Sequence, residues 1–268
     1  MPEGKHRQAT AAEGDDAQAE SGPRIFRHVG KHYVAFLSFV METLGTRSYF
    51  EIGTRKGGSL AGLNCNTVAV DPNFIINSNV IGGKSVCMFF QMGSDRFFED
   101  YKLSQLLNGP VEVAFLDGFH VYEYLLRDFI NTEKHCKKNS VIFMHDCLPF
   151  TQPMAERETP RNREARTQTK IARDFGGWTG DVWKVVPILR KYRPDLKIYA
   201  LDCPPTGLIM ITGLDPSNTV LDGKLFDIID EFRESPADPQ NLLEFGKTTE
   251  LIATKEILDL SDLGKYVW

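Results

Sequence analysis

The stretch from Ser48 to Asp71 constrains the fold more than any other part of this chain. It begins with a short β-prone run, passes through a loop that contains Gly53, Gly57 and Gly58, and ends with an apolar run that stops at Asp71. Glycine lets a backbone turn sharply and approach a ligand closely because it has no Cβ. An acid at the end of the second strand can accept both hydroxyls of a ribose. The pattern predicts a strand, a glycine loop, a short helix and a strand that hold a nucleoside cofactor.

The glycine spacing narrows the kind of cofactor. A dinucleotide-binding loop has the pattern G-x-G-x-x-G, which sets a helix N-terminus against a pyrophosphate. Here the pattern is Glu51-x-Gly53-x-x-x-Gly57, and its acid repels phosphate and suits a cationic ligand. An ordinary strand-to-helix turn is the plainer alternative. We favour a cofactor site because Asp71 agrees with it as well.

This loop resembles motif I of the class I S-adenosylmethionine (SAM) methyltransferases, whose cofactor carries an ammonium and a sulfonium but no phosphate. The resemblance implies a SAM site. In that family the adenine edge lies beside the segment after the third strand, although Ser94 equally fits a plain helix N-cap. The residues that we expect to bind the cofactor are Glu51, Gly53, Thr54, Gly57, Ser59, Asp71, Gly93, Ser94, Asp95 and Asp117.

Strands that alternate with helices predict an α/β fold. We expect a Rossmann-like, doubly wound, mostly parallel sheet of seven strands with right-handed crossovers, as in class I methyltransferases. Ligands of such sheets bind at the carboxyl ends of the strands. A helix over about Phe26–Leu44 should precede the first strand, and residues 222–268 should form a C-terminal helical appendage. After the two strands of the opening stretch, the expected strands are Lys84–Phe90, Val111–Leu116, Ser140–Met144, 196–201 and 208–212.

The composition predicts one domain with appendages, because 268 residues with 42% hydrophobic content can bury a full core. Residues 1–23 are polar and small, so we expect a disordered tail. The methyltransferase domain should span 24–221, with a lid at about 147–180. The arginines of this lid more often form a solvated helix face than a grip on an acidic substrate. The C-terminal helices could serve packing or a homo-oligomer contact.

The net charge and the spacing of the cysteines limit the classes of partner that we expect. A net charge of −5 argues against an obligatory nucleic-acid partner, which usually meets a basic face. The five cysteines form no C-x-x-C pair and read as reduced thiols. No apolar signal region is visible, and no run approaches the roughly 18 residues that span a bilayer. We expect a cytoplasmic protein with no nucleic-acid and no membrane partner, acting on a small molecule or glycan.

Acidic and imidazole groups follow the ends of the fourth and fifth strands, at Asp117, His145 and Asp146. Adjacent parallel strands lie about 4.8 Å apart, so these groups can converge on one divalent ion. Carboxylates suit Mg²⁺, and an imidazole shifts the preference toward Mn²⁺ or Fe²⁺. Such an ion can clamp two vicinal substrate oxygens and lower the pKa of the hydroxyl to be methylated.

His120 is the candidate general base. It follows Asp117 at the start of a helix and can turn back over the same strand end. An imidazole pKa near 6.5 suits the removal of a hydroxyl proton at neutral pH. The alternative for His120 is hydrogen bonding at a helix N-terminus, and for His145 a buried tautomer bonded to the backbone.

The run Asp117-Gly-Phe-His120-Val-Tyr122 resembles the Asp-Gly-x-His-x-Tyr signature of a methyltransferase family. That family includes macrolide-sugar O-methyltransferases and the cephalosporin-biosynthesis protein CmcI. The resemblance covers about 48–146, with weaker support over 180–213. It implies that Asp117 binds Mg²⁺, that His120 is the base, and that an acidic pair follows the fifth strand. This chain has His145 in place of one acid, which leaves the identity of the metal, and metal dependence itself, open.

Two classes of function remain. The leading hypothesis is a SAM-dependent O-methyltransferase that acts on a hydroxyl of a sugar, glycan or other natural product. The alternative is a non-catalytic scaffold or interaction protein that keeps the SAM pocket. A nicotinamide-dependent oxidoreductase is disfavoured because G-x-G-x-x-G is missing. Acceptor-dependent release of S-adenosylhomocysteine (SAH) distinguishes the enzyme from the scaffold.

Overall fold

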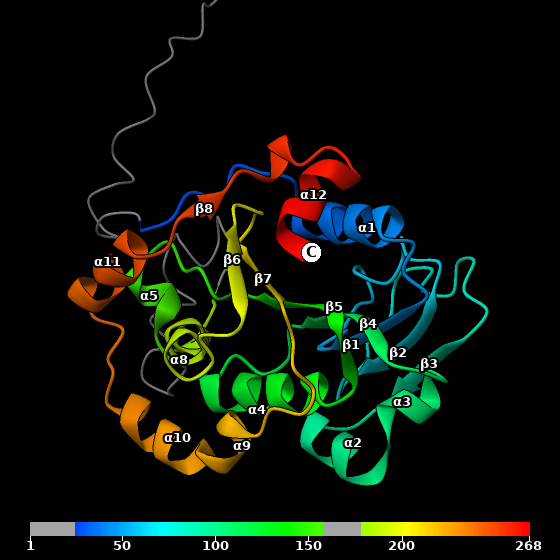
Figure 1. Ribbon diagram of the computed structural model, residues 1–268, viewed down its shortest axis with the longest axis horizontal. Helices are drawn as coiled ribbons and strands as arrows, with labels where there is room; N and C mark the ends of the chain where they lie inside the picture. Colours follow the sequence, from blue (N-terminus) through cyan, green and yellow to red (C-terminus); the bar gives the residue numbers. More distant parts are fainter. Residues whose placement is uncertain (1–24, 158–177) are drawn as a thin grey trace, which may run out of the picture.

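A computed structural model of the chain describes residues 25–157 and 178–268. The expected N-terminal tail and most of the Arg-rich part of the expected lid lie outside these residues. A central sheet has the strand order β3-β2-β1-β4-β5-β7-β6-β8, with helices on both of its faces (Figure 1). The strands are β1 Ser48–Ile52, β2 Asn66–Val70, β3 Cys87–Phe90, β4 Val111–Leu116, β5 Cys136–His145, β6 Lys197–Leu201, β7 Leu208–Thr212 and β8 Leu251–Ile252.

The sheet confirms the predicted mostly parallel α/β architecture. Strands β1 to β5 run parallel, whereas β7 is antiparallel to both of its neighbours, β5 and β6. The expected number of strands is wrong, since the sheet has eight strands and not seven. The additional strand, β8, pairs only two residues with Ala200 and Leu201 of β6. Two residues are too few to show the alternation of apolar and polar side chains by which a strand is predicted.

The helices divide between the two faces of the sheet (Figure 1). Helices α1 and α12 cover one face, and α2, α4 and α8 cover the other. Their bounds are α1 Tyr33–Thr43, α2 Ser94–Asp100, α3 Leu103–Leu106, α4 Tyr122–Glu133, α5 Gln152–Ala155, α8 Val185–Tyr192, α9 Val220–Gly223, α10 Leu225–Arg233, α11 Pro239–Lys247 and α12 Leu260–Val267, with 3₁₀ turns η1 Val182–Lys184 and η2 Thr254–Glu256.

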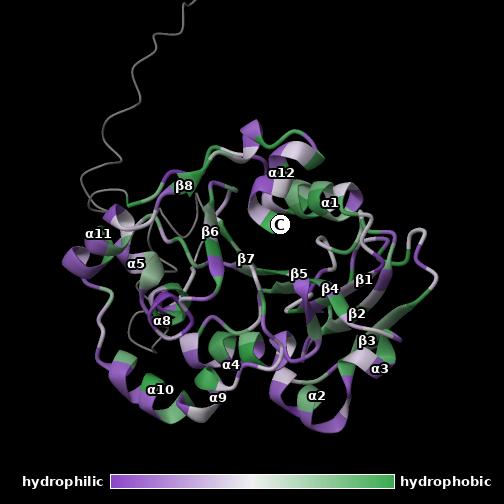
Figure 2. Ribbon diagram, viewed as in Figure 1, coloured by the Kyte–Doolittle hydropathy of each residue, from purple (hydrophilic) through white to green (hydrophobic). Residues whose placement is uncertain are grey.

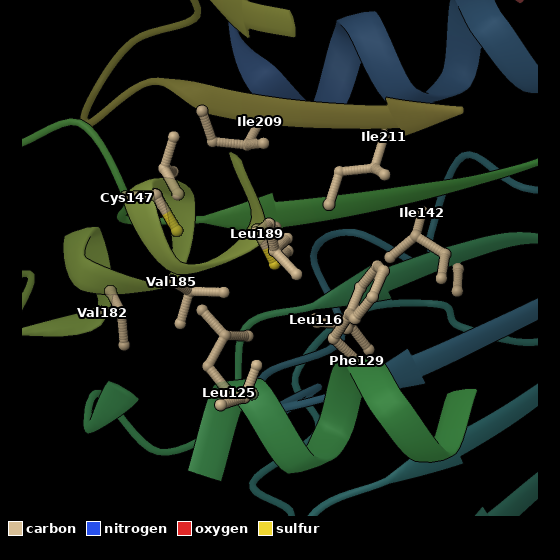
Figure 3. Packing of buried hydrophobic residues seen from close by; sticks show 14 of the residues in the cluster. Leu116, Leu125, Phe129, Ile142, Cys147, Val182, Val185, Leu189, Ile209 and Ile211 are labelled. Atoms are coloured by element: carbon tan, nitrogen blue, oxygen red, sulfur yellow. The ribbon is translucent and has the colours of Figure 1, made fainter. Parts of the chain in front are cut away.

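Burial explains why the middle strands are continuous apolar runs. Parallel strands covered on both faces are apolar at successive positions rather than at every second one. Figure 2 shows apolar residues gathered on the strands and on the helix faces turned toward them, with hydrophilic residues on outer helices such as α11. In Figure 3, Leu125 and Phe129 of α4 lie in one buried cluster with Leu116, Ile142 and Ile211 of the sheet. This packing holds the end of β4 and the start of α4 in place.

The N-terminal helix is shorter than predicted, because α1 begins only at Tyr33. The preceding residues instead run along the loops after β5 and β6. Ile25 N donates to Phe150 O at 3.0 Å, and Gly30 N donates to Asp202 O at 2.9 Å. These contacts are between segments far apart in sequence, so the periodicity of residues 26–44 does not reveal them. In the part of the chain that the structure describes, no helix is long and apolar enough to cross a membrane.

Candidate active site

A cavity of about 800 Å³ opens at the carboxyl ends of β1 to β4. Its walls come from the loops that follow these four strands, together with Tyr33 from α1. Of the residues expected to bind a cofactor, those that line it are Gly53, Thr54, Ser59, Asp71, Gly93, Ser94, Asp95 and Asp117. Glu51 and Gly57 are not among its lining residues.

The glycine loop brings the ends of β1 and β4 together. Gly53 has a φ of +89°, and a Cβ on it would lie 1.9 Å from the carbonyl oxygen of Asp117. No side chain fits at that distance, so this close approach requires glycine. Gly57 has a φ of +78°, and a Cβ there would lie 2.3 Å from Val80 Cγ1. Gly57 therefore serves the packing of the loop against Val80.

Glu51 lies beneath the loop and is fully buried. Its Oε2 accepts a hydrogen bond from the hydroxyl of Tyr49 at 2.6 Å, and its Oε1 accepts one from Ser59 Oγ at 2.7 Å. Burial raises the pKa of Glu51 to about 7, although these hydrogen bonds oppose the rise. The carboxyl group thus ties the wall residue Ser59 to β1, and direct contact between Glu51 and a cofactor stays a prediction.

Asp71 is placed at the end of β2 with both carboxylate oxygens directed at neighbouring backbone. Oδ2 accepts from Arg55 N at 2.8 Å, and Oδ1 accepts from Asn73 N at 2.7 Å. Arg55 belongs to the glycine loop and has a φ of +41°. A carboxylate oxygen can accept more than one hydrogen bond, so Asp71 keeps acceptor capacity toward the cavity.

The segment after β3 forms another wall, where Asp95 is paired with Arg127. Arg127 Nε and Nη2 donate to the two carboxylate oxygens of Asp95 at 2.9 and 2.7 Å. The N-cap of α2 is Gly93, so the alternative that Ser94 caps this helix is wrong. The Ser94 side chain bonds instead to Asp128, whose pKa burial raises to about 7. Ser94 and Asp95 are thus held by α4.

An exposed aromatic pair at this wall was not predicted. Phe119 is 60% exposed, and its ring meets that of Tyr124 edge-on with the centroids 5.1 Å apart. The guanidinium of Arg127 lies over the ring of Tyr124, 4.4 Å from its centroid. Tyr124 belongs to α4, lines the cavity and is 40% exposed. Both rings offer flat apolar surface to a bound group.

The ends of β4 and β5 bring two aspartates and two histidines into contact. Ligand atoms of Asp117, His120 and Asp146 lie within 4.8 Å of one another. His120 Nε2 is 3.1 Å from Asp146 Oδ2 and 3.7 Å from Asp117 Oδ1. His145 Nδ1 is 3.3 Å from Asp117 Oδ1 and 3.4 Å from Asp146 Oδ1. We call these four side chains the Asp–His cluster.

The two histidines face the aspartates from different sides. His120 lines the cavity, whereas His145 does not, and its side chain is 6% exposed. The ring of Tyr33 covers His145 with the centroids 4.3 Å apart. A cation site open to the cavity therefore includes His120 rather than the expected His145. Tyr33 was not predicted, because it comes from α1, far from any motif.

The orientation of His120 is fixed by the segment that follows the undescribed part of the expected lid. Its Nδ1 lies 2.9 Å from the carbonyl oxygen of Trp178, which can only accept, so Nδ1 carries a proton. Nε2 then faces the aspartates. Burial opposes a charge on His120, but the hydrogen bond to Asp117 and the charges of Asp146 and Asp117 outweigh it and raise the pKa to about 9.

Asp146 has an unusual backbone. Its φ is +59°, a left-handed conformation that is uncommon outside glycine and is found at functional sites. The hydroxyl of Thr206, from the loop between β6 and β7, donates to Asp146 Oδ1 and lies 3.3 Å from His145 Nε2. Thr206 thus holds two members of the Asp–His cluster, and no motif in the sequence points to it.

Tyr122, the last residue of the sequence signature, has a structural place. Its side chain is fully buried and its hydroxyl donates to the carbonyl of Ile229 at 2.7 Å. Its backbone N–H donates to Asp181 Oδ1 at 3.1 Å, at the start of α4. The tyrosine therefore anchors the helix that carries Asp128 and follows His120.

A glycine loop, an acid at the end of β2 and a polar cluster at the next strand ends together define an α/β enzyme domain with a cofactor cavity. Residues 50–147 match the model of a family described as a methyltransferase domain. This segment, which carries the glycine loop, Asp71 and the Asp–His cluster, is therefore similar to a methyltransferase domain.

The fold is similar to solved methyltransferase structures. The O-methyltransferase TomG from Streptomyces achromogenes, involved in tomaymycin synthesis and in complex with SAM, has 13% identity, with a TM-score of 0.47 over 68% of this chain and 79% of that chain. The SAH-bound methyltransferase PaMTH1 of Podospora anserina has 12% identity and a TM-score of 0.45 over 68% and 78%. No curated protein matches the sequence.

Proposed function

We propose that this chain is a methyltransferase that uses SAM to methylate a hydroxyl group of a small-molecule acceptor such as a sugar, glycan or other natural product. The observation that carries the proposal is the continuity of the cavity. Asp71 and the glycine loop line the same space as Asp117 and His120. A cofactor bound along β1 and β2 therefore lies beside a group that can take a proton from an acceptor.

The cofactor end of the cavity fits a cationic nucleoside. Asp71 suits the ribose hydroxyls, and the flat faces of Phe119 and Tyr124 suit an adenine ring. The lining also holds the carboxylates of Asp71, Asp95 and Asp117, beside the cations Arg55 and Lys56, and a carboxylate can complement a sulfonium or an ammonium. Arg127 pairs with Asp95, and His120 and His145 lie beside Asp117, so Asp71 is the carboxylate of the lining that has no cationic partner among these contacts.

The affinity for SAM depends on Asp71. We expect Asp71→Ala to weaken SAM binding by about 1 to 3 kcal/mol, because a charged acceptor for the ribose is lost. Asp71→Asn, which keeps one carbonyl oxygen, should lose less. Calorimetric titration measures both, with Asp100→Ala on the exposed side of α2 as a control for charge. Unchanged SAM affinity in Asp71→Ala would remove Asp71 from the cofactor site.

The reaction is a displacement at the methyl carbon. The acceptor oxygen forms a bond to the carbon, the carbon–sulfur bond breaks, and the sulfonium becomes the neutral thioether of SAH. The protein needs chiefly to align oxygen, carbon and sulfur and to remove the hydroxyl proton. His120 Nε2 is the atom placed to receive that proton, since Nδ1 already donates to the Trp178 carbonyl. The carboxylates of Asp146 and Asp117 then stabilise the imidazolium.

The Asp–His cluster also fits a divalent cation. Two carboxylates and one imidazole, with ligand atoms within 4.8 Å of one another, are a donor set for Mg²⁺ or Mn²⁺. Asp117, His120 and Asp146 would hold the ion, which would supply a lower pKa for a bound hydroxyl. Nε2 is the only nitrogen of His120 that faces the aspartates. His120 therefore serves as a ligand or as a base, but not as both at one moment.

Chelation separates these two versions of the mechanism. In the version with a cation, EDTA should abolish turnover while leaving SAM affinity nearly unchanged, because the cation would orient the acceptor rather than the cofactor. Adding back Mg²⁺ or Mn²⁺ should restore the rate, and Asp146→Asn should reproduce the loss. Full activity in EDTA would contradict the cation and leave His120 as the base alone. SAH release with a panel of hydroxylated acceptors measures the rate.

A cytoplasmic location and a homo-oligomer through the C-terminal helices remain predictions, as do the proposed domain limits. Sedimentation of the purified chain tests the oligomer.

The alternative of a non-catalytic scaffold protein predicts a different result from the enzyme hypothesis. A scaffold protein would bind SAM but would release no SAH with any acceptor.

A further inference from the structure

A second cavity, of about 720 Å³, lies between α8, α10 and α11, helices that neighbour one another in Figure 1. None of the residues that line it also lines the cofactor cavity. It is separate from the Asp–His cluster, and the proposed reaction gives it no role. The lining residues are Trp183, Pro187, Arg190, Lys191, Phe232, Ser235, Asn241, Glu244, Phe245 and Thr248.

Arg190 is a cation without a counter-ion in this cavity. Its one hydrogen bond with described residues runs from Nη1 to Thr249 Oγ1, at 3.0 Å. Across residues 25–157 and 178–268, no carboxylate lies within 4.0 Å of its guanidinium. The two other charged residues of the lining are already paired, Lys191 with Glu231 and Glu244 with Lys247.

Partial burial makes this unpaired charge costly. The side chain of Arg190 is half-buried, and loss of hydration lowers the pKa of its guanidinium. A desolvated cation is normally paired, because its lost hydration is otherwise uncompensated. The planar guanidinium offers five donors, of which one is used. The guanidinium of Arg190 therefore has donors that an anionic acceptor in the cavity could bind.

Other parts of the lining are aromatic. The rings of Trp183 and Phe245 lie with their centroids 5.5 Å apart, and Phe232 is a further apolar part of the lining. The indole Nε1 of Trp183 is buried without a hydrogen-bond partner. An unpaired buried donor is unfavourable unless an acceptor reaches it. The cavity thus combines apolar surface with the Arg190 guanidinium, which has no ionic partner among the described residues.

We infer that this cavity is a second binding site, for a small amphipathic carboxylate. The carboxylate would pair with Arg190, because a carboxylate matches the planar fork of guanidinium with two parallel hydrogen bonds. The apolar body of the ligand would lie against Trp183 and Phe245. The site uses no part of the cofactor cavity, so the ligand binds whether or not SAM or SAH is present.

The test uses 2-naphthoate as the probe, titrated calorimetrically into the full chain with SAH in excess and again without SAH. We expect one molecule to bind per chain under both conditions. Arg190→Gln should weaken this binding at least tenfold, and the neutral isostere 2-naphthamide should bind at least tenfold more weakly to the unmodified chain. Lys265→Gln is the matched control, because it removes one exposed positive charge from α12, which contributes no residue to the lining of this cavity.

A second variant covers the case in which Arg190→Gln does not fold. Asn241→Asp adds a carboxylate to an exposed position of the same lining and should also weaken binding of 2-naphthoate. The inference is overturned if the unmodified chain binds no 2-naphthoate or binds 2-naphthamide equally well. It is also overturned if a folded Arg190→Gln or Asn241→Asp chain keeps full affinity, or if SAH alone abolishes binding.

Discussion

Replacing His120 with alanine should lower kcat by about a hundredfold to ten-thousandfold, the range expected for loss of a general base. The structure places Nε2 of this residue 3.1 Å from Asp146 and leaves it as the only ring nitrogen free of the backbone. SAM affinity should change little, and so should the melting temperature near pH 9, where the raised pKa of His120 no longer contributes stability. A residue that only stabilises the start of α4 would give the opposite result, about 1 kcal/mol of stability and a normal kcat.

The kcat and the melting temperature of His120→Ala need to be measured on one preparation. His135→Asn is a suitable control, since His135 precedes β5 at the edge of the sheet away from the cavity. A His120→Ala chain that melts early but turns over normally at every pH would show that His120 is structural. Loss of turnover in His120→Ala, together with an unmodified chain that EDTA does not inhibit, would favour the role of His120 as a base over its role as a metal ligand.

The pH dependence follows from the raised pKa of His120. Only the neutral ring can take a proton, and its pKa of about 9 means that the neutral fraction grows as pH rises toward 9. The rate of the unmodified enzyme should therefore climb between pH 6 and 9, and His120→Ala should lose that climb. Stability runs the other way. A folded pKa above the unfolded value of about 6.5 contributes stability below pH 6.5, which is lost as pH rises through about 9.

The sheet and one end of the site were predictable from the sequence for a common reason. Buried parallel strands are continuous apolar runs, and their ends are marked by the first polar residue. Asp71, Asp117 and the pair His145-Asp146 occupy those marked positions, and Asp71 and Asp117 line the cavity. Asp117 and Asp146 lie close together because β4 and β5 are adjacent parallel strands, as the alternation of strands and helices implied.

The rest of the site depends on contacts that carry no local signal. Tyr33 covers His145 from a helix before the sheet, and Thr206 holds Asp146 from a loop after it. The carbonyl of Trp178 fixes the His120 ring, yet any residue offers a carbonyl, so side-chain identity does not encode this contact. The enclosure of His145 carries no local signal either, since it depends on Tyr33 and Thr206, and a role of His145 as a metal ligand stays a prediction.

Gly53→Ala should cost both stability and activity. A Cβ at this position would lie 1.9 Å from the carbonyl oxygen of Asp117 and 2.8 Å from the nitrogen of Gly118, both backbone atoms that cannot rotate away. The φ of +89° adds strain for any residue with a Cβ. Backbone strain of about 1 to 3 kcal/mol and overpacking of about 1 to 3 kcal/mol together predict a loss of about 2 to 6 kcal/mol in the free energy of unfolding.

The same contact links stability to catalysis. Relief of the clash requires β1 to move away from the end of β4, where Asp117 N donates to Ile52 O at 2.9 Å. Asp117 would then shift relative to His120, so the Gly53→Ala chain that remains folded at low temperature should still turn over slowly and bind SAM weakly. Denaturant unfolding measures the first effect and SAH release the second. Gly223→Ala is the matched control, because a Cβ there meets no atom within 4 Å. A Gly53→Ala chain as stable as Gly223→Ala would show that the two strand ends can separate without cost, and the close approach would no longer explain the glycine.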